Sequence, residues 1–185
     1  MTHPTKPLAS SRFRGDPKSV TEHGSARILV ACVGNIFRSD DAFGVEVARR
    51  LAGVDLPEGT KLVDFGIRSV HLVYELMDGY DVLVLVDTVA QQDGPPGSLY
   101  VIEPDMAALT AGEPPPLDPH DLPPGGVLAL LPSLGGMVDR VLVVGCTPER
   151  LGDGIGLSET VEAALDPAAA MVLDVVRRES SRITA

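Results

Sequence analysis

The sequence has few cysteines and no long uninterrupted apolar run, and each absence removes a class of protein. Its 185 residues include two cysteines, Cys32 and Cys146, which lie far apart in apolar segments. This usage indicates neither a disulfide framework nor a CxxC zinc site, so we expect buried, reduced thiols. No segment approaches the roughly 18 to 20 consecutive apolar residues of a membrane-spanning helix. We therefore expect a soluble, cytoplasmic protein without a membrane anchor.

Positive charge is also scarce. The chain has 15 Lys and Arg residues against 26 Asp and Glu residues, which gives a formal net charge of −11. Over most of such a surface the phosphates of nucleic acids and of anionic membranes are repelled. We therefore expect no nucleic-acid or membrane partner, and a protein or metal-bearing partner fits better.

Several catalytic and nucleotide-binding motifs are missing. The glycine-containing segments GNIFRSDDAFG (34–44) and GDGIGLS (152–158) match neither the phosphate-binding loop nor the G-x-G-x-x-G fingerprint. No G-x-S-x-G elbow occurs, and Cys32 falls inside an apolar run rather than at its exposed end. The sequence therefore supports neither nucleotide binding nor a serine or cysteine nucleophile.

The length and composition predict one folded domain with short tails. Hydrophobic residues make up 44% of the chain, enough for one well-filled core at this length. Residues 1–25 are polar and rich in Pro, Ser and basic residues, without the apolar core of a secretory signal, so we assign them to a disordered tail. We assign residues 26–179 to a single α/β domain and residues 180–185 to a C-terminal tail.

Apolar, β-branched runs alternate with helical patterns along the domain. The predicted strands are residues 26–33, 60–66, 81–89, 97–104 and 139–146, and the predicted helices are residues 40–52 (with Ser39 as N-cap), 69–79, 127–134 and 157–178. Strands that are apolar throughout and alternate with helices predict a three-layer α/β/α sandwich with a mostly parallel sheet.

Two connections have predicted consequences. The segment between strands 81–89 and 97–104 is too short for a helical crossover, so we expect these two strands to form an antiparallel pair. The Pro-rich stretch 111–126 cannot form regular structure and is interpreted as a loop.

Acidic residues follow three of the predicted strands. Asp40 and Asp41 come one short loop after the first strand, Asp64 lies at the end of the second, and Asp87 ends the most apolar strand. Carboxyl ends of parallel strands meet at one edge of a sheet, and His120 in the long loop could reach it. Two carboxylates and an imidazole suit nickel, zinc or iron and leave coordination positions open for a substrate or a water.

Each of these residues also has a simpler explanation. Acids such as Asp40 and Asp41 are favoured in the first turn of any helix by the helix dipole. A loop histidine such as His120 is often only a surface residue. Asp87 is ambiguous, because an acid after so apolar a strand is partly desolvated unless it is paired or binds a metal. Spacing alone leaves these alternatives open.

Four segments in the same order resemble one known family. They are ILVACVGNIFRSDDAFGVEVARRL (28–51), DVLVLVDTV (81–89), DPH (118–120) and VLVVGCTPERLGDGIGLSETVEAAL (141–165). Together they resemble the hydrogenase maturation proteases, endopeptidases that trim the C-terminus of the large subunit of nickel-iron hydrogenases. The most specific parts are the G-N-x-x-x-x-D-[DE]-x-x-G opening and the G-L-S-x-x-V segment.

The resemblance implies a mixed five-stranded sheet between helical layers, and it implies site residues. By position, Asp41, Asp87 and His120 correspond to the family's nickel-contacting residues, which we also take as the catalytic set. The family often has glutamate where this chain has Asp41, and Asp40 is the immediate competitor for that role. Where the family commonly has D-G-G-T, this chain has DFGIRS (64–69), so Asp64 is a second-rank candidate.

The resemblance further implies a function and a partner. The expected partner is a hydrogenase large-subunit precursor that already carries nickel, so that the metal arrives with the substrate and cleavage releases a C-terminal extension. Whether nickel or an aspartate activates the attacking water stays open. The alternatives are a non-catalytic metal-sensing assembly factor for the same precursor and a metal-dependent hydrolase of small amides. We expect a monomer, although no residue pattern decides the oligomeric state.

Overall fold

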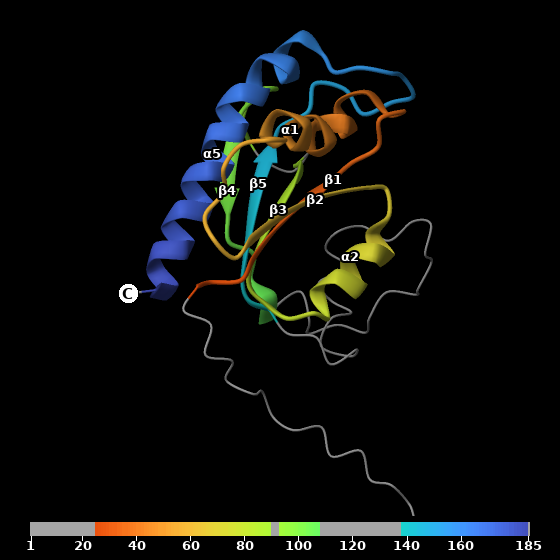
Figure 1. Ribbon diagram of the computed structural model, residues 1–185. Helices are drawn as coiled ribbons and strands as arrows, with labels where there is room; N and C mark the ends of the chain where they lie inside the picture. The colour runs from red at the N-terminus through yellow and green to blue at the C-terminus, as the bar shows by residue number, and fades with distance from the viewer. Residues whose placement is uncertain (1–24, 90–92, 108–137, 185) are drawn as a thin grey trace, which may run out of the picture.

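The computed structural model describes residues 25–89, 93–107 and 138–184 (Figure 1). Several predicted features lie outside these residues, among them nearly all of the N-terminal tail, the Pro-rich stretch 111–126, the helix at 127–134 and His120. None of the described helices is long and apolar enough to cross a membrane.

A five-stranded sheet forms the centre of the molecule. Its strands are β1 (Ile28–Val33), β2 (Thr60–Gly66), β3 (Tyr80–Thr88), β4 (Leu99–Ile102) and β5 (Val138–Cys146). They lie in the order β2-β1-β3-β5-β4, and all neighbours are parallel except β4 and β5. The predicted mixed, mostly parallel five-stranded sheet is therefore confirmed.

The predicted antiparallel pairing of β3 with β4 is wrong, because β5 lies between them. Residues just after β3 and just before β4 both form backbone hydrogen bonds at the carboxyl end of β5. The Val89 N–H donates to the Cys146 carbonyl at 2.9 Å, and Thr147 accepts from the Gly97 N–H at 2.8 Å. β5, most of whose residues are buried, takes the interior position next to β3, and the short, half-exposed β4 is the edge strand.

Helices cover both faces of the sheet. They are the 3₁₀ turn η1 (Ser39–Ala42) and the α-helices α1 (Phe43–Leu51), α2 (Ser69–Leu76) and α5 (Glu159–Thr184). Among these, α1 and α5 cover one face and α2 the other (Figure 1). Alternation along β1 fits this arrangement, because Ile28 and Val30 face the α1 and α5 layer while Leu29 and Ala31 face α2. The described residues thus form the predicted three-layer sandwich.

Helix boundaries differ from the sequence prediction by a few residues, most of all at the end of α5 and the start of α1. Residues 180–184, assigned above to a tail, continue α5. Ser39 does not cap the first helix: α1 begins at Phe43, after a 3₁₀ turn, and its N-cap makes no side-chain hydrogen bond. Ser39 instead is buried with φ of 51°, and its N–H donates to the Gly154 carbonyl at 2.9 Å. A contact with a distant loop therefore decides the conformation at this position.

Candidate active site

Asp41 and Asp87 meet at the carboxyl edge of the sheet. Asp87 is the penultimate residue of β3, and Asp41 lies in the η1 turn that follows the neighbouring strand β1. They are close enough for the negative charge of Asp41 to contribute to the raised pKa of Asp87. The structure therefore brings together two of the three residues that the family resemblance selected.

Glycines allow the helix layer to approach the strand ends this closely. A Cβ atom on Gly44, in the first turn of α1, would lie 2.1 Å from the Val33 carbonyl oxygen and 2.4 Å from that of Val86. Gly34 has φ of 148°, and a Cβ atom there would lie 2.0 Å from the Asp41 carbonyl oxygen. Only glycine fits at such approaches. The start of α1 thus rests directly on the ends of β1 and β3.

Only one of the two carboxylate oxygens of Asp41 accepts a hydrogen bond from the described residues. Its side chain is half-buried, and its Oδ2 accepts the Asn35 N–H at 3.1 Å. The other carboxylate oxygen accepts no hydrogen bond from the described residues. Asp41 therefore offers an oxygen that can contact a ligand.

Asp87 has an unusual protonation equilibrium. Burial raises the pKa of its carboxyl from 3.8 to about 7, and the charge of Asp41 adds to this effect. The Thr88 N–H, which donates to Asp87 Oδ1 at 2.7 Å, opposes it. A carboxyl group with a pKa near neutrality can take up and release a proton at pH 7, as a general base or acid must.

Asp40, unlike Asp41, uses its carboxylate in internal hydrogen bonds. It is fully buried, and it accepts hydrogen bonds from the Glu149 N–H (2.9 Å), the Arg150 N–H (2.8 Å), the Ser158 N–H (2.6 Å) and the Ser158 hydroxyl (3.0 Å). Burial alone would raise the pKa of Asp40, but these bonds outweigh it and hold the pKa below its usual value. Both oxygens are therefore committed to the loop that joins β5 to α5.

Asp64 stands apart from the aspartate pair. Its side chain is exposed, and its Oδ1 accepts the Gly66 N–H at 2.9 Å at the carboxyl end of β2. It also lines an open pocket beside this strand end. This geometry gives Asp64 a local turn contact and no place beside Asp87.

The donor set for a metal is incomplete within the described residues. They contain no group of three or more His, Cys, Asp or Glu side chains that could hold a metal ion. Asp41 and Asp87 supply two carboxylates at the sheet edge, and the predicted third donor, His120, lies outside the described residues.

The cysteines are buried and free, as predicted. Burial raises the pKa of Cys32 to about 12 and that of Cys146 to about 11, with a smaller contribution from a nearby aspartate in each case. Only the thiolate is an effective nucleophile, so neither cysteine is suited to nucleophilic catalysis.

Comparison with known proteins assigns the chain and its fold to one class. The family described as hydrogenase maturation protease matches residues 45–175. The hydrogenase 2 maturation protease of Escherichia coli is 33% identical over 153 residues, which cover 82% of this chain and 91% of that protein. The HupM hydrogenase expression/formation protein of Azotobacter chroococcum is 32% identical over 151 residues, which cover 80% and 71%.

Solved structures agree. The hydrogenase maturating endopeptidase HybD from E. coli superposes with a TM-score of 0.69 at 32% identity, over 83% of this chain and 93% of that one. The nickel-iron hydrogenase maturation protease HycI from Thermococcus kodakarensis gives 0.63 at 25% identity, over 83% and 94%. The chain belongs to the hydrogenase maturation protease family.

Proposed function

We propose that this protein is an endopeptidase that removes the C-terminal extension of a nickel-loaded hydrogenase large-subunit precursor. The observation that carries the proposal is the Asp41 and Asp87 pair at the carboxyl edge of the sheet, in a chain of this family. One acid of the pair has an oxygen available for a ligand, and the other has a pKa near 7. Cytoplasmic location and a monomeric state stay predictions from the sequence.

The two aspartates have complementary roles in the proposed reaction. Asp41 contacts the nickel that the precursor carries. Asp87, as a carboxylate, takes a proton from the water that attacks the scissile carbonyl carbon, and the carbon-nitrogen bond then breaks. Asp87 returns that proton to the departing amine nitrogen, so the group is regenerated. A metal next to the carbonyl oxygen would stabilise its developing negative charge.

The donor count supports nickel as a part of the substrate. Catalytic zinc sites, for example, usually have three protein ligands and one open position. The described residues supply only two carboxylates, Asp41 and the Asp87 oxygen that does not act as the base, and His120, which lies outside them, would add the imidazole of a mixed set that nickel accepts. The precursor's own ligands would complete the coordination, so we expect weak binding of free nickel to the isolated protein.

Intact-mass spectrometry of a cognate precursor tests the proposal. Wild-type protein should release one C-terminal peptide from the nickel-loaded precursor and none from the nickel-free form. The variants Asp41→Asn and Asp87→Asn should each lower the cleavage rate by roughly 100-fold or more, as expected when a general base or a metal contact is lost. Asp55→Asn, at an exposed position away from the site, is the matched control and should cleave normally.

The outcomes separate the competing functions. Stable complex formation without cleavage would favour a metal-sensing assembly factor. Normal turnover by either Asp41→Asn or Asp87→Asn would contradict the assigned role of that residue.

A further inference from the structure

An open pocket adjoins the aspartate pair on the β2 side. It has a volume of about 360 Å³ and lies between the turn after β1, helix α1 and the end of β2 with the turn that follows it. Asn35 belongs to its wall, and the N–H of this residue donates to Asp41 Oδ2 at 3.1 Å. A chain bound in the pocket would therefore be next to the proposed catalytic residues.

Apolar side chains around this pocket are unusually exposed. Phe37 and Ile67 have exposed fractions of 62% and 65%, and Ile36 of 38%. All three line the pocket, and buried Val45 and Phe65 contribute to its wall. Exposed apolar residues that gather around a hollow, rather than singly over the surface, indicate a binding site for an apolar group.

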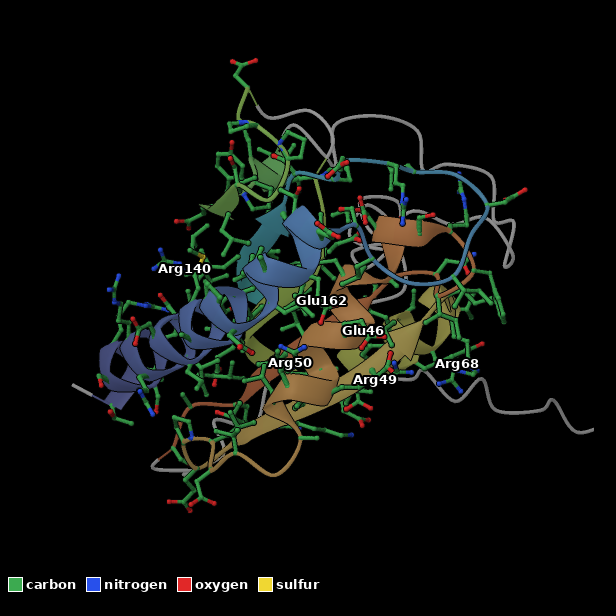
Figure 2. The ribbon with its side chains drawn as sticks, turned by 90° about the horizontal axis from the view of Figure 1, so that it is seen from above. Glu46, Arg49, Arg50, Arg68, Arg140 and Glu162 are labelled. Atoms are coloured by element: carbon green, nitrogen blue, oxygen red, sulfur yellow. The ribbon has the colours of Figure 1, made fainter. Side chains whose placement is uncertain are left out.

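An arginine that has no ionic partner among the described residues lies at the same pocket. Arg49 and Arg68 both line it and lie on the same side of the molecule (Figure 2). Arg49 forms an ion pair with Glu46 of the same helix. Exposed Arg68 donates from Nε to the Phe65 carbonyl at 3.4 Å and forms no ion pair within the described part of the chain. In a chain of net charge −11, a guanidinium with no acidic partner in the described segments thus lies beside an apolar pocket.

We propose that this pocket binds a short segment of the precursor in which an apolar side chain is next to an aspartate or glutamate. The apolar side chain enters between Phe37 and Ile67, and the carboxylate pairs with Arg68, whose planar guanidinium suits a carboxylate. The inference rests on the proposed function, because it takes the protein's substrate to be a polypeptide. A segment beside the scissile bond has chain on both sides, so its carboxylate belongs to a side chain and not to the chain terminus.

Binding can be measured separately from cleavage. Overlapping 15-residue peptides, acetylated and amidated, would cover the C-terminal region of the cognate precursor and would be titrated into the ¹⁵N-labelled full-length protein. A peptide with an apolar-acidic pair should shift the amide signals of Asn35, Ile67 and Arg68. Changing its acid to Gln should weaken binding about five- to twentyfold, as expected for loss of a charge-assisted contact near the surface.

Variants of the protein test the same contact from the other side. Arg68→Gln should produce the same five- to twentyfold loss with the acidic peptide and no further loss with its Gln version. Ile67→Ser should weaken both peptides. Arg177→Gln, an exposed arginine on α5, is the matched control and should change neither. In the cleavage assay, Arg68→Gln should raise KM and leave kcat near the wild-type value.

Several results would overturn the inference without touching the proposed function. The first is equal binding of the acidic and Gln peptides, and the second is tighter binding of a peptide with Lys in place of the acid, which would indicate a contact with Asp64. The third is a requirement for a free C-terminal carboxylate. The fourth is chemical shifts that change with protein concentration alone, which would indicate that a second copy of the protein occupies the pocket. If the peptides bind as described but the wild-type protein cleaves no precursor, the proposed function fails instead.

Discussion

Replacement of Asp40 by asparagine tests the distinction between the two adjacent aspartates. Asp40 is fully buried and accepts four hydrogen bonds, three on Oδ2 and one on Oδ1. Asparagine has nearly the same shape but keeps only one acceptor oxygen. The substitution therefore perturbs the hydrogen bonds and very little of the packing.

The expected loss follows from the geometry. If the asparagine oxygen takes the place of Oδ2, its NH₂ group faces the Ser158 N–H, which donated to Oδ1 at 2.6 Å. A buried N–H without an acceptor costs about 1–3 kcal/mol, and the three remaining bonds fall to roughly half their strength when the charge is lost. Relief of the cost of burying a charge offsets a part of this. We expect the free energy of unfolding to fall by about 3 kcal/mol, and Tm by about 6–12 °C at this chain length.

Urea denaturation of the full chain at pH 7 measures this loss, and Asp41→Asn is the matched control. Asp41 is half-buried and accepts one side-chain bond, from the Asn35 N–H. Its substitution should change the free energy of unfolding by less than about 1 kcal/mol. The two adjacent variants should therefore have opposite profiles, with stability lost in Asp40→Asn and cleavage lost in Asp41→Asn.

Acid titration gives a second check. The pKa of Asp40 is lower in the folded than in the unfolded chain, so its ionised form stabilises the fold above the unfolded pKa of about 3.9. This contribution is lost as the pH falls through the folded pKa. The stability difference between wild type and Asp40→Asn should therefore shrink below about pH 4. A variant within about 0.5 kcal/mol of wild type at pH 7, or an equal loss in Asp41→Asn, would refute the reasoning.

Two further variants test the site's electrostatics and its close approach. Burial raises the pKa of Asp87 from 3.8 to about 7, so the neutral carboxyl favours the folded state below about pH 4, and this stabilisation is lost as the pH rises through 7. Asp87→Asn stays neutral and should match wild type near pH 4 but gain up to about 4 kcal/mol at pH 8, from roughly three pKa units at about 1.4 kcal/mol each; a variant less stable than wild type at pH 8 contradicts the assignment. Gly44→Ala would place a methyl group 2.1 Å from the Val33 carbonyl oxygen and 2.4 Å from that of Val86. It should lower the free energy of unfolding by about 1–3 kcal/mol, as overpacking does, and slow cleavage by moving the start of α1. Gly152→Ala meets no atom within 4 Å and serves as its control in urea denaturation and cleavage assays; equal behaviour of the two glycine variants would argue against a tight contact.

Much of the fold is readable from local patterns. The strand at 60–66 was predicted with the bounds of β2, and the other observed strands differ from their predictions by a few residues at either end. Buried parallel strands carry apolar residues on both faces, so they stand out in the sequence. The position of β5 between β3 and β4 had no such signal, because strand order depends on contacts between segments distant in the chain.

The site divides in the same way. Because the carboxyl ends of parallel strands meet at one edge of a sheet, the sequence predicted that Asp41 and Asp87 lie at that edge, and the structure agrees. Asp40 and Asp41 have the same chemistry and the same local setting, so only the family resemblance favoured Asp41, and no local pattern showed what Asp40 does. The hydrogen-bond partners that separate them are 109 to 118 residues away from Asp40. The placement of Arg68 beside an apolar pocket, with no ion pair to any described residue, had no local signal either.

By itself, the sequence determined the layers of the fold, the edge that holds the candidate acids and the resemblance to one family. These depend on the period of apolar residues and on short motifs, which a chain carries locally. Only the tertiary structure decided which aspartate is a structural acceptor, which one has an oxygen available, and why the carboxyl of Asp87 titrates near pH 7. Burial and long-range hydrogen bonds set the protonation and availability of a carboxyl group, and both exist only after distant segments have come together.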